Sequence, residues 1–358
     1  TAWEATVAEP TIIPDTNTEF EDLFAPYIQE VINASGNKTE KRFIDAISDG
    51  LRQAMQKHEN LVIMGQDVAE YGGVFKITEG FVEQFGKERV RNTPLCESAI
   101  IGTGLGLSIA KMKAVVEMQF ADFVTMGFNQ IVNNLAKIHW RWGQNADVVV
   151  RMPTGAGTAA GPFHSQSNEA WFFHVPGLKV VYPAFPEDAK GLLTAAIDDP
   201  NPVMYFEHKY LYRHLKQEIH DDYYTIEIGK AKTVKSGTEI SVITYGMGAH
   251  WALEVAEKHP EISLEILDLR TLAPLDKEAI FESVKNTGKV IVLHEDNFTG
   301  GVGGEIAALI NENCFEFLDA PVKRIAALDT PIPFDANLEQ NYLPINRFEE
   351  AVLELKAF

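Results

Sequence analysis

The stretch that decides the fold runs from residue 114 to residue 152 and reads AVVEMQFADFVTMGFNQIVNNLAKIHWRWGQNADVVVRM. It begins with the apolar run Ala114–Met118 and ends with a second run, Val148–Met152. Between the two runs, the segment Ala121–Trp142 is predicted to be helical. Short apolar runs separated by helical segments are typical of parallel strands that are buried on both faces.

The same alternation continues on both sides of this stretch. Further strand candidates are Leu61–Met64, Lys179–Tyr182 and Val203–Phe206, and further helix candidates are Phe43–Met55, Thr78–Phe85, Glu97–Ala110 and Glu187–Ile197. In the first of these helices the apolar residues recur at helical spacing, which indicates one buried face. We therefore predict an α/β fold that begins with a mainly parallel sheet covered by helices on both faces.

A second alternating block follows a charged, Tyr-rich connector at residues 207–228. Its strand candidates are Ile240–Tyr245, Ser263–Leu267, Lys289–Leu293 and Val322–Ala326, and its helix candidates are Ala249–Lys258, Asp276–Asn286, Glu305–Asn313 and Arg347–Lys356. This pattern predicts a second, smaller α/β domain. We place the two domains at residues 38–222 and 223–358.

Residues 1–37 form an acidic extension with seven Asp or Glu residues and no Lys or Arg. Pro10, Pro14 and Pro26 interrupt any regular pattern, and only Phe20–Val31 could form a short helix.

The whole chain has a net charge of −20, which argues against nucleic-acid binding. No apolar run approaches the roughly 18 to 20 residues that a membrane span needs. Two cysteines are too few for a disulfide framework and favour a reducing compartment.

Two positions are candidates for chemistry. Glu97 lies between a probable strand and an apolar helix, at the edge of the sheet where α/β folds bind ligands. It could equally be a first-turn acid that stabilises the helix dipole. His164 lies in a Gly/Pro-flanked loop after a strand, where a histidine can transfer protons near neutral pH. It could also be a structural loop residue bonded to a carbonyl group.

The loop before His164 also has a formal G-x-G-x-x-A pattern at residues 155–160. Gly161 and Pro162 follow at once and exclude the helix that would bind a dinucleotide pyrophosphate. We therefore predict a mobile loop there, not a nucleotide site.

Taken together, several segments resemble the beta subunits of the thiamine-diphosphate-dependent decarboxylating components of 2-oxoacid dehydrogenase complexes, most closely the branched-chain type. The resemblance covers about residues 40–358. The segments that carry it are residues 65–68 (GQDV), 73–75 (GVF), 92–97 (NTPLCE), 117–123 (EMQFADF), 163–167 (FHSQS), 176–181 (PGLKVV) and 268–271 (DLRT).

The resemblance implies a pyrimidine-binding domain followed by a transketolase C-terminal-type domain. It implies that Glu97, as a largely buried carboxyl group, shares a proton with a ring nitrogen of the cofactor's aminopyrimidine. Leu95, Gln119 and Phe123 match residues that line the pyrimidine pocket. His164 matches a histidine that handles protons at the reacting centre and in acyl transfer to lipoyl groups. Gln66 departs from the family, in which an acid is often found.

The resemblance also implies partners. The G-D-G motif that holds the diphosphate and magnesium is not found in this sequence, and in the family it belongs to the alpha subunit. We therefore expect an alpha2beta2 heterotetramer that serves a lipoyl-bearing acyltransferase core. The acidic extension could be the end of, or a linker from, a fused alpha half. A potassium site is a weaker expectation, near Ala196, Asp199 and Asn201.

Two other functions remain open: a pyruvate dehydrogenase beta subunit, or a non-catalytic scaffold of the same fold. The expected compartment is the bacterial cytoplasm, or the mitochondrial matrix in a eukaryote.

Overall fold

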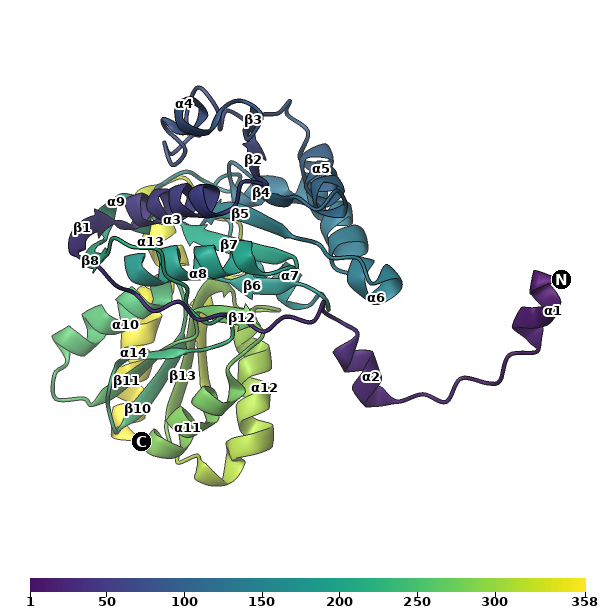
Figure 1. Cartoon of the computed structure of the whole chain (residues 1–358). Coiled ribbons are helices and arrows are strands. Elements are labelled where there is room, and N and C mark those ends of the chain that lie inside the picture. The colour runs from purple at the N-terminus through teal and green to yellow at the C-terminus, as the bar shows by residue number, and fades with distance from the viewer.

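The computed structural model describes residues 1–358, and its larger sheet has seven strands in the order β12-β6-β7-β5-β4-β2-β3 (Figure 1). Every pairing is parallel except that of β12 with β6, as expected for a mainly parallel sheet. The strands are β2 (Leu61–Gly65), β3 (Val90–Asn92), β4 (Lys113–Glu117), β5 (Val148–Thr154), β6 (Lys179–Val181), β7 (Val203–His208) and β12 (Thr271–Ala273).

A second sheet of five strands, in the order β14-β13-β10-β11-β9, is formed from the second half of the chain. Its strands are β9 (Lys232–Lys235), β10 (Ile240–Thr244), β11 (Leu264–Asp268), β13 (Val290–Asn297) and β14 (Lys323–Ala327). Only β9, which pairs with β11, is antiparallel. The two-domain α/β prediction is therefore confirmed, and the two sheets lie one above the other in Figure 1. A separate antiparallel ribbon joins β1 (Lys38–Arg42) to β8 (Lys216–His220).

Alternate residues of each central strand face opposite sides of the sheet and enter two different apolar clusters. In β4, for example, Val115 belongs to one cluster and Val116 to the other. Each cluster runs through both domains. The helices that cover the first cluster include α3 (Phe43–Lys57), α8 (Pro186–Asp198), α10 (Met247–Lys258) and α14 (Ile345–Ala357), and those of the second include α5 (Glu97–Ile109), α11 (Lys277–Thr287) and α12 (Val302–Cys314).

The remaining helices are short. They are α1 (Ala2–Val7), α2 (Thr16–Glu21), α4 (Phe81–Phe85), α6 (Ile138–Trp142), α7 (Glu169–Phe173), α9 (Leu211–His214), η3 (Phe315–Phe317) and α13 (Ala336–Tyr342). None of the helices has the length and apolar character that a membrane span requires.

The prediction of one helix at Ala121–Trp142 is wrong. The segment is a 3₁₀ helix (η1, Ala121–Gly127), a π-helix (η2, Gln130–Leu135) and then α6. A Cβ atom on Gly127 would overlap the side chain of Ile101, so this glycine allows the segment to pack closely against α5. Changes of helical pitch such as these are frequent at functional sites.

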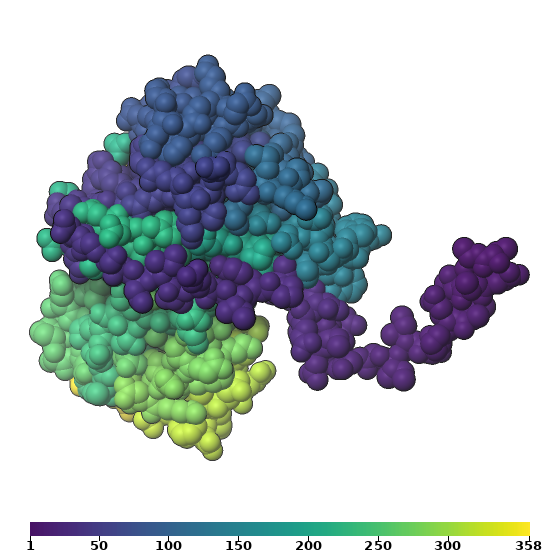
Figure 2. Space-filling view, viewed as in Figure 1, coloured from purple at the N-terminus to yellow at the C-terminus, as the bar shows by residue number.

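The acidic extension divides into two parts. Residues 1–22 project from the molecule, whereas residues 23–37 lie along the junction of the two domains (Figures 1 and 2). The predicted helix at Phe20–Val31 is wrong, because this backbone bonds to the protein instead of to itself. Asn201 binds both backbone groups of Ala25, and Thr225 binds the Ile32 amide at 2.8 Å and the Glu30 carbonyl at 2.9 Å.

The buried carboxyl group of Asp268 gives a testable pH dependence. Burial, aided by the Asp188 carboxylate, raises the pKa of Asp268 from 3.8 to about 7, although Arg270 and Lys232 oppose this. As the pH rises from about 4 to about 7, the unfolded chain releases this proton while the folded chain keeps it. Asp268 therefore destabilises the fold increasingly across this range, and fully above pH 7.

We expect Asp268→Asn to raise Tm by several degrees at pH 8 and by about half as much at pH 5.5, where the destabilisation is only partly developed, since about 2–4 °C corresponds to 1 kcal/mol in a domain of this size. Thermal unfolding of both proteins at the two pH values measures this. The same Tm change at both pH values would contradict the assignment.

Candidate functional site

The candidate site lies at the carboxyl ends of β2, β3 and β4, where parallel strands place their following loops side by side. Glu97 is the first residue of α5 and is only 7% exposed. Its Oε1 accepts a hydrogen bond from Nε2 of Gln66 at 3.0 Å, and its Oε2 receives none from the chain. Glu97 is thus a buried carboxyl group with one oxygen free.

An open cavity of about 590 Å³ is formed around this carboxyl group. It is lined by Leu95, Cys96, Glu97, Ser98, Phe123, Thr125 and Met126. Leu95 and Met126 are 82% and 69% exposed, and together they form an exposed apolar rim beside the cavity. A hollow with apolar walls and a single carboxyl group is suited to a flat heteroaromatic ring, and its exposed rim to a covering partner.

His164 is connected to this cavity through Phe123. The ring centroid of His164 lies 4.8 Å from that of Phe120 and 5.5 Å from that of Phe123, in both cases edge to face. No hydrogen bond from the chain engages either nitrogen of the His164 ring. Phe123 therefore contacts both the Glu97 cavity and a histidine whose nitrogens are available.

Three of the five candidate site residues, Leu95, Glu97 and Phe123, line the cavity, and His164 lies edge to face against Phe123. Gln119 does not line the cavity, and its Nε2 instead donates to Oδ2 of Asp67 at 3.3 Å. From its place after β4, Gln119 supports the loop at the rim.

Among the residues that sequence reasoning missed, Asp122 and Lys209 hold the His164 loop from the first domain. Oδ1 of Asp122 accepts the Gln166 amide at 3.2 Å, and burial raises the pKa of Asp122. Nζ of Lys209 donates to the Gly155 carbonyl at 2.6 Å, and burial lowers the pKa of Lys209 to about 8. The only sequence signal for either residue was that Asp122 lies in the segment 117–123, which carries the family resemblance.

Beneath the site, a buried ionic cluster fixes the strand ends. The Arg151 guanidinium binds Glu117 at 2.6 Å and Glu207 at 2.6 and 2.7 Å, which connects β5 to both of its neighbours. Burial raises the pKa of Glu117 despite the nearby arginine. Paired charges like these are tolerated in a core because their mutual attraction and hydrogen bonds offset the cost of removing them from water.

The potassium candidates lie in the last turn of α8, at Ala196, and in the loop that follows it, at Asp199 and Asn201. The side chains of two of them are already engaged: the Asp199 carboxylate pairs with Lys179, and Asn201 binds Ala25. A potassium ion would need backbone carbonyl groups, including that of Ala196. No cluster of three or more His, Cys, Asp or Glu side chains suited to a metal is present anywhere in the chain.

Comparisons with known proteins show which family the chain resembles. The transketolase pyrimidine-binding domain family matches residues 40–214, and the transketolase C-terminal domain family matches residues 229–347. The chain is 46% identical to the 2-oxoisovalerate dehydrogenase subunit beta of Bacillus subtilis over 323 residues, which cover 88% of this chain and 98% of the relative.

Other relatives differ in their named substrates. A mitochondrial 2-oxoisovalerate dehydrogenase subunit beta 2 of Arabidopsis thaliana is 41% identical, covering 91% of this chain and 92% of the relative. A pyruvate dehydrogenase beta subunit of Bacillus subtilis is 42% identical, covering 84% and 94%. Among solved structures, the inactive beta4 tetramer of a split-gene transketolase matches with a TM-score of 0.72 at 22% identity, covering 90% of this chain and 98% of that one.

Proposed function

The chain belongs to the family of beta subunits of 2-oxoacid dehydrogenase decarboxylating components, and on this premise we propose that it supplies half of an active site that oxidatively decarboxylates branched-chain 2-oxoacids. The observation that carries the proposal is the Glu97 carboxyl group, buried at the floor of an apolar hollow with one oxygen free. When bound, thiamine diphosphate supplies the electron sink for loss of carbon dioxide.

The residues of this chain fit the aminopyrimidine of that cofactor. Leu95 and Phe123 would pack against the faces of the ring. The free oxygen of Glu97 would share a proton with a ring nitrogen, and Gln66 would hold the carboxyl group in place. His164 would give or take a proton at the substrate, because its ring nitrogens have no partner in the chain.

We propose that an alpha subunit covers the apolar rim and holds the diphosphate and its magnesium. Exposed apolar side chains of the first domain support the proposal. Trp140 and Trp142 of α6 are 55% and 65% exposed, and Leu95 and Met126 at the cavity are also exposed. The acyl group would pass to a lipoyl-bearing acyltransferase core.

The division of the chain into domains at residues 222 and 223 is supported by the family matches, which end at 214 and resume at 229. The occurrence of relatives in a bacterium and in mitochondria supports the cytoplasm or the matrix as the compartment.

The substrate preference is the finer part of the proposal. We expect the enzyme assembled with its alpha subunit to prefer 2-oxoisovalerate to pyruvate by about 10- to 200-fold in kcat/KM, the range that a few methyl groups in an apolar pocket provide. Steady-state kinetics with both substrates on one preparation measures the ratio. A preference for pyruvate would make the chain a pyruvate dehydrogenase beta subunit and leave the roles of Glu97 and His164 unchanged.

A further inference from the structure

The loop that carries His164 is held by the second domain. Glu339 of α13 is 4% exposed, and its carboxylate accepts two backbone amides of this loop. The Gly157 amide donates to Oε1 and the Ala159 amide to Oε2, each at 3.0 Å. A carboxylate that receives an N–H on each oxygen makes strong, charge-assisted bonds and fixes the direction of both amides.

A second carboxylate anchors both ends of the same loop. Oε1 of Glu295 accepts the Ala156 amide at 2.6 Å and the Ser167 hydroxyl at 3.3 Å. Its Oε2 lies 2.6 Å from Nε2 of His208. Burial alone would raise the pKa of Glu295, but His208 and the Ala156 amide hold it below its ordinary value. Residues 155–160, which the sequence predicts to be a mobile loop, belong to no helix or strand, and three of their backbone amides bond to carboxylates of the second domain.

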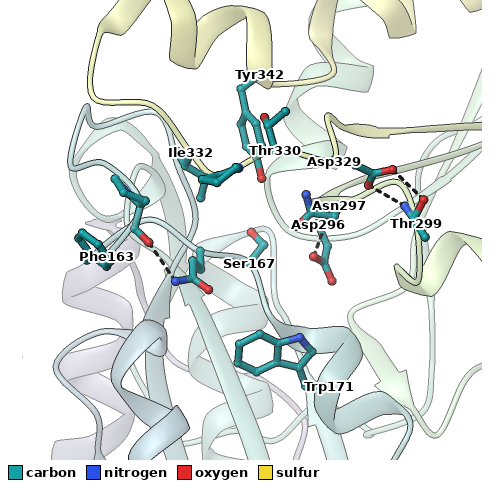
Figure 3. A pocket seen from close by; sticks show the side chains of 13 residues that line it. Phe163, Ser167, Trp171, Asp296, Asn297, Thr299, Asp329, Thr330, Ile332 and Tyr342 are labelled. Atoms are coloured by element: carbon teal, nitrogen blue, oxygen red, sulfur yellow. Dashed lines mark hydrogen bonds between the residues drawn. The ribbon is translucent and has the colours of Figure 1, made fainter.

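Side-chain packing between the His164 loop and the second domain is incomplete. Figure 3 shows a cavity between the loop, at Phe163 and Ser167, and the second domain, at Asp296, Ile332 and Tyr342. Its volume is about 760 Å³. Gly161 does contact the ring of Phe334, and a Cβ atom there would overlap it. Across this cavity, Glu295 and Glu339 are the second-domain side chains that bond to the loop, whereas Asp122 and Lys209 hold it from the first domain.

We propose that Glu339 is a positioning residue for His164. By binding the loop backbone, it would let the second domain fix the position of the histidine relative to the reacting centre. Glu339 lies on the domain opposite to His164 and acts only through the loop backbone. The proposal rests on the role of His164 under the proposed function. A misplacement of about 1 Å of a catalytic group can lower a rate about 10²-fold.

The test is Glu339→Gln in the full chain, assembled with its alpha subunit. A glutamine has one acceptor oxygen, and its NH₂ group would face one of the two amides. We expect the lipoyl-dependent rate to fall about 10- to 100-fold, and hydrogen exchange at residues 156–160 to become faster. The Kd for thiamine diphosphate should change little. Glu349→Gln is the matched control, since Glu349 binds Lys258 and His259 within the second domain, and it should leave the rate unchanged.

A double mutant separates positioning from general damage. In a His164→Ala background, Glu339→Gln should lower the rate no further. A full additional decrease, or a normal rate for the single Glu339→Gln variant, would overturn the positioning role. A normal rate for His164→Ala alone would instead overturn the proposed function of His164. If Glu339→Gln fails to fold, Glu339→Asp provides the same comparison, because it keeps the charge but retracts the carboxylate by one methylene group.

Discussion

Replacing Glu97 by glutamine should lower kcat of the assembled enzyme by about 10² to 10⁴, the usual effect of losing a positioned acid–base group. The amide has nearly the same shape, and its oxygen can still accept the bond that Gln66 donates to Oε1. It cannot, however, exchange a proton with a ring nitrogen bound at the other position. The measurement is the rate of oxidative decarboxylation of 2-oxoisovalerate at saturating cofactor.

The control for this prediction is Glu88→Gln. Glu88 precedes β3, at the end of the strand opposite to Glu97, and it is exposed and paired with Arg91. Glu88→Gln should keep normal activity, and both variants should keep the Tm of the unmodified protein. If a folded, cofactor-bound Glu97→Gln enzyme retained near-normal kcat, Glu97 would have no part in proton transfer and would be the helix-capping acid of the alternative interpretation.

The parts of the fold that could be predicted from sequence are those in which burial dictates residue type. β5 is buried along its whole length, and its apolar run stands out from its flanks. The ribbon of β1 and β8 could not be predicted, since its residues are mostly polar and exposed and the backbone pairing alone holds it together. The three-residue strand β12 is too short to carry any periodicity.

The candidate site divides in the same way. The position of Glu97 at a strand-to-helix junction and that of His164 in a Gly/Pro-flanked loop were visible in the sequence. The residues that hold the His164 loop were not, because they bond to backbone groups far away along the chain. Glu295 is 139 residues from Ala156, and Glu339 is 182 residues from Gly157. A side chain that recognises a remote amide leaves no local pattern, so only the tertiary structure reveals such contacts.

His164→Ala should slow the lipoyl-dependent reaction by about 10² to 10⁴ while changing the Kd for thiamine diphosphate only a few-fold. The reason is the separation of the two parts of the site. The apolar hollow that contains Glu97 is not lined by His164, whereas the histidine ring stands edge-on to Phe120 and Phe123 with both nitrogens free. Cofactor binding and the lipoyl-dependent rate are measured on the same preparation.

The matched control is His214→Ala, since His214 is exposed, stacks on Tyr210 and bonds to the carbonyl group of that residue. An unchanged lipoyl-dependent rate for His164→Ala would make His164 a structural loop residue. Normal rates for both His164→Ala and Glu97→Gln would point to the non-catalytic scaffold. A loss in both, with cofactor still bound, requires that this chain contribute catalytic groups from two different loops, which a scaffold that only binds partners does not do.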